Sequence, residues 1–210
     1  MYTDAKLTYL REKVRQNMKP SRFAHTLSVE KEVERMANLY LPRQKSELRA
    51  AAILHDLTKG LVDEEQIKLC ETLGIPLTDE LRRVPQVLHG LSAAKIIEND
   101  FPEFATPSIL NAIRVHTTGE VDMDVFSLIL FVADFIEEGR PYPSCKALRN
   151  SYWAMVENDR SLYPLRYAAL MSIKFTLDYL NRENLLVANK TLDAMQELEK
   201  LLECEDLSCQ

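Results

Sequence analysis

The sequence is poor in glycine and lacks any cysteine pattern typical of a disulfide framework or a zinc knuckle. Only 5 of its 210 residues are glycine, and its apolar residues recur mostly at steps of three and four, which together predict an all-α chain. The four cysteines, Cys70, Cys145, Cys204 and Cys209, form no CxxC pair, and two of them stand in the polar tail. We therefore expect reduced thiols and a cytoplasmic location.

Long apolar runs and an excess of basic residues are also missing. No segment holds the roughly 18 uninterrupted apolar residues of a membrane-spanning helix, and the start MYTDAKLTYLREKV does not read as a secretory signal. The net charge of −6 argues against a duplex nucleic acid as partner. A small polyanionic substrate fits better, because a bound metal can supply the local positive charge.

The chain does contain regular helical patterning from end to end, with no strand-like alternation. Its length and its 46% hydrophobic content predict one domain over residues 1–210. The candidate site residues and their motifs fall at about 20–140, and C-terminal helices are expected at about 145–203. Ser21 is an expected N-cap and Gly60 an expected helix stop. The predicted helices span residues 3–17, 21–40, 46–59, 63–73, 85–99, 106–119, 122–138, 145–158, 162–180 and 187–203.

All four histidines and two of the aspartates share faces with apolar residues. His25, for example, lies on the stripe of Val29, Val33 and Met36, so its side chain should point into the core. A single inward histidine is usually a satisfied core residue, but an unpaired buried carboxylate costs several kcal/mol. One shared metal site would remove these costs together. The predicted ligands are His25, His55, Asp56, His89, His116 and Asp134.

The ligand types predict two divalent metal ions. His25, His55, Asp56 and Asp134 would hold one ion, while His89 and His116 would hold the second, with Asp56 bridging the two. Mixed nitrogen and oxygen ligands suit iron, manganese, zinc or cobalt.

Five segments resemble a known superfamily when taken in order. The order His25, His55-Asp56, Asp134 is similar to the pattern of HD phosphohydrolases. SRFAHTLSV, AAILHDLTKG, VLHGLSAA, IRVHTTG and VADFIEEGR together resemble the YqeK family, over about residues 20 to 180. The resemblance implies an HD-domain helical bundle with additional C-terminal helices and a two-iron site. It further implies symmetrical cleavage of diadenosine tetraphosphate, a nucleotide substrate, to two ADP.

The mechanism expected from this resemblance is attack of a metal-bridged hydroxide on an inner phosphorus. Asp56 and Lys59 are the predicted catalytic residues. Lys59, Arg140 and Arg22 are the predicted phosphate clamps, although each has an alternative interpretation as solvated surface charge. Thr117, with Thr118 and Gly119, would either offer hydroxyl and N–H groups to a phosphate or cap a helix.

Three other interpretations stay open at this point. The chain could hydrolyse another nucleotide, such as a nucleoside monophosphate or guanosine tetraphosphate. It could be a non-catalytic nucleotide-binding sensor module, or an interaction protein that uses its C-terminal helices as a contact surface. The sequence is compatible with a homodimer but does not determine the oligomeric state, the native metal or the nucleobase preference.

Overall fold

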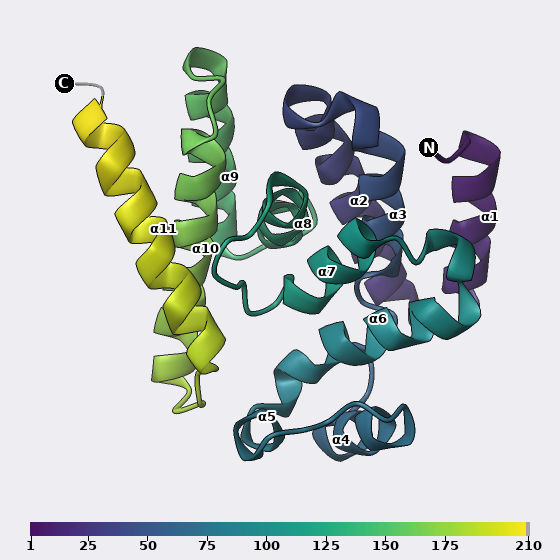
Figure 1. Cartoon of the computed structure of the whole chain (residues 1–210). Helices are drawn as coiled ribbons and strands as arrows, with labels where there is room; N and C mark the ends of the chain where they lie inside the picture. Colours follow the sequence, from purple (N-terminus) through teal and green to yellow (C-terminus); the bar gives the residue numbers. More distant parts are fainter. Residues whose placement is uncertain (209–210) are drawn as a thin grey trace.

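The computed structural model describes residues 1–208, and all regular structure in this range is helical (Figure 1). The prediction of an all-α fold is therefore confirmed. Three 3₁₀ turns link some of the helices, at Pro42–Gln44, Pro85–Val87 and Pro102–Phe104. The α-helices are α1 (Asp4–Arg15), α2 (Pro20–Tyr40), α3 (Lys45–Leu54), α4 (Asp63–Thr72), α5 (Asp79–Arg83), α6 (Leu88–Asp100), α7 (Pro107–Val115), α8 (Val125–Ile136), α9 (Pro143–Asn158), α10 (Tyr163–Arg182) and α11 (Asn189–Ser208).

Helix α8 occupies the centre of the molecule. Its sequence VFSLILFVADFI is apolar almost all round, which is typical of a fully buried helix. Its first turn is capped by the Asp124 carboxylate, which accepts a hydrogen bond of 2.7 Å from the N–H of Ser127. Helix α8 contacts α2, α3, α7, α9 and α10, and Figure 1 shows it between the N-terminal helices and α9–α11. Asp134 therefore projects from the most buried helix of the fold.

Helices α6 and α7 approach each other closely at a glycine. A Cβ atom added to Gly90 would lie 2.7 Å from the carbonyl oxygen of Ile113, a distance that no real side chain tolerates. The neighbouring residue, His89, therefore comes close to His116 at the end of α7.

The C-terminal helices share one hydrophobic core with the rest of the chain. This core includes Leu7 in α1 and Leu202 in α11. The indole N–H of Trp153 in α9 donates a hydrogen bond of 2.6 Å to the Glu32 carboxylate in α2. Tyr152 is fully buried. Trp153 and Phe175 are partly buried against this core, whereas Tyr179 is 53% exposed.

Several predicted helix boundaries are wrong. Helix α3 ends at Leu54 instead of Lys59, and α7 ends at Val115 instead of Gly119, so the metal-site histidines that follow them lie at helix ends. Helix α11 continues to Ser208, beyond the predicted end at 203. Helix α5 was not predicted because its five residues include none that is buried, and it therefore lacks an apolar period.

No described helix combines the length and the apolar composition needed to cross a bilayer. Cys70 and Cys145 are buried free thiols, and Cys209 lies outside the described residues.

Candidate metal centre

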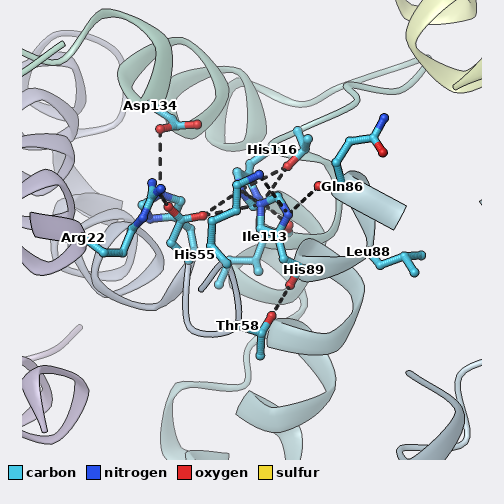
Figure 2. Close-up of polar contacts among 12 residues, drawn as sticks. Arg22, His55, Thr58, Gln86, Leu88, His89, Ile113, His116 and Asp134 are labelled. Atoms are coloured by element: carbon cyan, nitrogen blue, oxygen red, sulfur yellow. Dashed lines mark hydrogen bonds and ion pairs between the residues drawn. The ribbon is translucent and has the colours of Figure 1, made fainter. Parts of the chain in front are cut away.

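The structure brings the six predicted ligands together from five segments of the chain, and Figure 2 shows four of them, His55, His89, His116 and Asp134. His25 comes from α2, His55 and Asp56 from the turn after α3, His89 from α6, His116 from the end of α7, and Asp134 from α8. Within the described residues, two overlapping groups could each hold an ion with ligand atoms less than 4.8 Å apart. These groups are His25, His55 and Asp134, and His55, Asp56 and His116.

The carboxylate of Asp56 faces two pairs of imidazoles at once. Its Oδ2 atom lies 3.7 Å from Nε2 of His25 and 3.4 Å from Nε2 of His55. Its Oδ1 atom lies 3.4 Å from Nε2 of His89 and 3.7 Å from Nε2 of His116. Asp56 is only 4% exposed. A carboxylate in this position can bridge two adjacent cations through its two oxygens.

Asp134 completes the first of these two groups. Its Oδ1 atom lies 3.0 Å from Nε2 of His25 and 3.8 Å from Nε2 of His55. In the second pair of imidazoles that Asp56 faces, the Nε2 atoms of His89 and His116 are 3.0 Å apart. The four imidazoles thus direct the same ring nitrogen toward the centre.

The opposite nitrogen, Nδ1, of three imidazoles faces a backbone carbonyl three residues earlier. Because a carbonyl only accepts hydrogen bonds, Nδ1 must carry the proton, which leaves the Nε2 lone pair for a metal. His55 and His116 follow the last residues of α3 and α7, where carbonyl groups lack helical partners. The three hydrogen bonds join His55 to Ala52 at 2.7 Å, His89 to Gln86 at 2.9 Å and His116 to Ile113 at 2.7 Å.

Glu137 serves the fourth imidazole and was not predicted from the sequence. Its Oε1 atom lies 3.1 Å from Nδ1 of His25, and its Oε2 atom accepts a hydrogen bond from the N–H of Gly139. Glu137 is only 2% exposed. A usable signal existed, because Glu137 follows Asp134 by three residues, a spacing that places both on one side of the predicted helix 122–138; in the structure Glu137 directly follows α8.

The charges around the centre favour ionised carboxylates. Burial alone would raise the pKa values of Asp56 and Asp134. Neighbouring imidazoles, and Arg140 beside Asp134, instead hold both pKa values well below the usual range. Burial would likewise lower the pKa of His25, but hydrogen bonds to Asp134 and Glu137 raise it to about 9.

His89, in the second pair of imidazoles, is in a more positive environment. Burial, together with the charges of Lys59 and His116, holds the pKa of His89 well below its usual value. His89 is therefore neutral at pH 7, which is the form that binds a metal.

The three predicted phosphate clamps all lie at the centre. Nη1 of Arg22 is 2.8 Å from Oδ2 of Asp56, and Nη2 of Arg140 is 2.6 Å from Oδ1 of Asp134. Nζ of Lys59 lies 3.4 Å from Nδ1 of His89, and burial lowers the pKa of this lysine. These three cations therefore surround the centre from separate segments of the chain.

Thr117 also faces the centre. Its Oγ1 atom lies 3.1 Å from Nε2 of His89 and 3.3 Å from Nε2 of His116. This hydroxyl is therefore within reach of any group held by the two imidazoles.

Gly119 ends a helical turn, which favours the capping alternative, and its predicted contact with a phosphate stays a prediction. Its N–H already donates to the carbonyl of Val115 at 2.7 Å, and its φ of 67° suits glycine. A Cβ at this position would meet Ala194 and Met123. The hydroxyl of Thr118 donates to the carbonyl of Gly119, so it too belongs to the turn.

A buried polar network holds the turn that carries His55 and Asp56. The Thr58 hydroxyl donates to the carbonyl of His89 at 3.1 Å (Figure 2) and lies 2.7 Å from the hydroxyl of Ser92. The Gln66 side-chain amide donates to the carbonyl of Thr58. These contacts fix the turn against α4 and α6.

A groove of about 380 Å³ opens beside the centre. Another hollow, of about 220 Å³, involves Asp122 and residues of α8, α10 and α11 but none of the centre's residues. The groove's lining includes Arg22, His25, Glu137, Gly139, Arg140 and Tyr142.

Known proteins with similar sequences or structures indicate the family of this chain. The model of the HD domain family matches residues 22–139. Two proteins named symmetrical bis(5'-nucleosyl)-tetraphosphatase are each 28% identical to this chain. That of Staphylococcus aureus aligns over 86% of this chain and 88% of its own length, and that of Bacillus subtilis over 81% and 86%. A crystal structure from Clostridium acetobutylicum, described as a predicted HD superfamily hydrolase involved in NAD metabolism, matches with a TM-score of 0.79 and 28% identity. This match covers 95% of this chain and 98% of that one.

Proposed function

This chain belongs to the HD domain family, and we propose that it cleaves diadenosine tetraphosphate symmetrically to two ADP. The resemblance to HD phosphohydrolases inferred from the motifs is confirmed by the family match over residues 22–139. The chain is an HD-domain hydrolase related to symmetrical bis(5'-nucleosyl)-tetraphosphatases. The exact reaction and the identity of the metal belong to the proposal.

The observation that carries the proposal is the double orientation of Asp56. One of its oxygens faces His25 and His55, and the other faces His89 and His116. These residues, with Asp134, would hold the divalent cations, and their mixed nitrogen and oxygen donors suit such ions. When bound, such cations supply Lewis acidity and lower the pKa of coordinated water toward neutrality. We assign iron to the site, with manganese, cobalt and zinc as the alternatives to be tested.

The chain's own cations then bind and orient the tetraphosphate. Arg22 and Arg140 can each present planar N–H groups to phosphate oxygens, and Lys59 can offer a compact charge from the other side. The oxygen of water adds to an inner phosphorus, and the bond from this phosphorus to the central bridging oxygen breaks. One nucleoside diphosphate leaves, and the other retains the new oxygen. Dispersal of negative charge by these side chains stabilises the transition state.

Product chromatography tests the reaction. Protein purified without air is analysed for metals and then incubated with diadenosine tetraphosphate. Two equivalents of ADP and no other nucleotide are expected, with two metal ions per chain. Formation of ATP and AMP would show cleavage of an outer P–O–P bridge and would refute symmetrical cleavage.

A nucleotide panel separates the other interpretations. Release of orthophosphate from nucleoside monophosphates, or of pyrophosphate from guanosine tetraphosphate, with higher kcat/KM than for diadenosine tetraphosphate would establish a different substrate. Binding without turnover in fully metal-loaded protein would favour a sensor module. We expect a cytoplasmic enzyme with a small nucleotide substrate, since the net charge of −6 disfavours nucleic acid.

A further inference from the structure

An exposed tyrosine lines the groove beside the metal centre. Tyr142 is 60% exposed, and its neighbours in the groove lining include His25, Arg22 and Arg140. A single exposed aromatic residue on a protein surface needs no special explanation. The Tyr142 ring, however, lines the same groove as His25, a candidate metal ligand. It also lines this groove with Arg22 and Arg140, which contact the carboxylates of the candidate metal centre.

The backbone holds Tyr142 in one conformation. It stands between Pro141 and Pro143, and α9 begins directly after it. Its φ of −65° and ψ of 138° match the extended region to which a following proline restricts a residue. The ring is therefore presented by a stiff segment, which lowers the entropy lost when a ligand binds to it.

The groove has the charge that a polyphosphate requires. The side chains of Arg22 and Arg140 are 36% and 28% exposed, so both remain accessible beside the carboxylates that they contact. Glu137 also lines the groove, but its carboxylate is already engaged by His25 and the N–H of Gly139. The accessible charge in the groove is therefore positive.

The size of the groove limits what it can hold. Its volume of about 380 Å³ is near the lower end of the roughly 300–1,000 Å³ found for ligand pockets. This space is large enough for one nucleoside diphosphate half of a dinucleotide.

We propose that this groove binds one nucleoside diphosphate half of the substrate, with its base stacked on Tyr142 and its phosphates beside Arg22 and Arg140. The proposal deepens, and rests on, the function proposed above. Stacking on an aromatic face tolerates different bases, because every base has a π-face. Tyr142 thus distinguishes nucleotides from inorganic polyphosphates more than it distinguishes one base from another.

Calorimetric titration of metal-loaded protein with ADP and with inorganic pyrophosphate tests this assignment. Tyr142→Ala is expected to weaken ADP binding roughly fivefold to 150-fold, the range for loss of one stacked base. Pyrophosphate affinity should stay within about twofold, because its binding needs no ring. Tyr142→Phe, which keeps the ring, should restore ADP binding. Tyr179→Ala is a matched control, since Tyr179 is 53% exposed and does not line the groove.

An unchanged ratio of ADP to pyrophosphate affinity in Tyr142→Ala would overturn the assignment, even if the wild-type protein hydrolyses diadenosine tetraphosphate. The opposite combination is also informative. If the wild-type protein does not hydrolyse diadenosine tetraphosphate, but Tyr142→Ala lowers the ratio of ADP to pyrophosphate affinity, the proposed reaction is refuted. That second result would still support the groove as a nucleotide subsite.

Discussion

The carboxylate of Glu137 lies 3.1 Å from Nδ1 of His25, while Nε2 of the same ring lies 3.0 Å from Asp134. The imidazole is therefore held at both ends, by one carboxylate inside the candidate centre and another behind it. Such carboxylate–histidine pairs orient a ligand and increase its basicity, and their removal typically costs roughly 10-fold to 100-fold in metal affinity or activity.

Glu137→Gln should accordingly weaken metal binding by about 10-fold or more without unfolding the protein. The amide keeps the shape of the side chain but loses the charge that supports His25. Titration of chelator-treated protein with Mn²⁺ measures the effect, and added metal should partly restore activity. Glu138→Gln is the matched control, because the Glu138 side chain is 74% exposed and pairs with Lys31. Equal metal affinities in the two variants would remove Glu137 from this role.

Asp56→Asn should lose at least one of the two expected metal ions, together with activity. The neutral amide cannot offer two anionic oxygens to the two imidazole pairs that Asp56 faces. Elemental analysis of protein purified without air gives the stoichiometry, and Asp100→Asn, at an exposed position, should leave it unchanged. Two metals per chain in Asp56→Asn would contradict a bridging role.

Lys59→Ala should keep the metal content but raise KM or lower kcat for diadenosine tetraphosphate. Nζ of Lys59 lies 3.4 Å from Nδ1 of His89 and interacts electrostatically with Asp56 and Asp134, so we expect its charge to act on a phosphate at the centre. Steady-state kinetics with matched metal loading measures the change, and Lys68→Ala, at an exposed position in α4, serves as control. If kcat/KM does not change, Lys59 is not a phosphate clamp.

Gly90→Ala should destabilise the protein by about 1–3 kcal/mol, because the added methyl group overpacks the contact between α6 and α7. It would meet the carbonyl oxygen of Ile113 at 2.7 Å, and moving the helices apart would separate His89 from His116. Urea unfolding and metal analysis should both respond. Gly60→Ala is a strict control, since no atom lies within 4 Å of the position that a Cβ would take there. Similar stability in both variants would show that α6 and α7 accommodate the methyl group freely.

Removal of metal by a chelator should lower Tm, and adding a divalent metal should restore it. A ligand that binds only the folded state stabilises it by about 2.7 kcal/mol at a concentration 100 times its Kd. Thermal unfolding of wild-type protein with and without Mn²⁺ provides the measurement, and the metal-dependent increase should shrink in Asp56→Asn. A Tm that is independent of metal in the wild-type protein would argue against an ion at this cluster.

Much of the fold followed from local patterns. Apolar steps of three and four predicted nearly all the helices, because such a stripe is what a helix buries against its neighbours. The pattern failed at α5, which buries none of its residues, and at the ends of α3 and α7. At these ends the imidazoles of His55 and His116 donate hydrogen bonds to the carbonyls of Ala52 and Ile113, three residues earlier. These side-chain hydrogen bonds compete with continuation of the helix, and the apolar period of the sequence does not reveal them.

The sequence by itself determined which residue types were available: four histidines and two aspartates that are costly to bury separately, in an order typical of HD proteins. The tertiary structure alone decided how they face one another. It directed each Nε2 inward, split the oxygens of Asp56 between two imidazole pairs, placed Glu137 behind His25 and brought Tyr142 into the groove with Arg22 and Arg140. The physical reason is that ligand geometry depends on helix packing, such as the close contact at Gly90, which joins residues far apart in the chain.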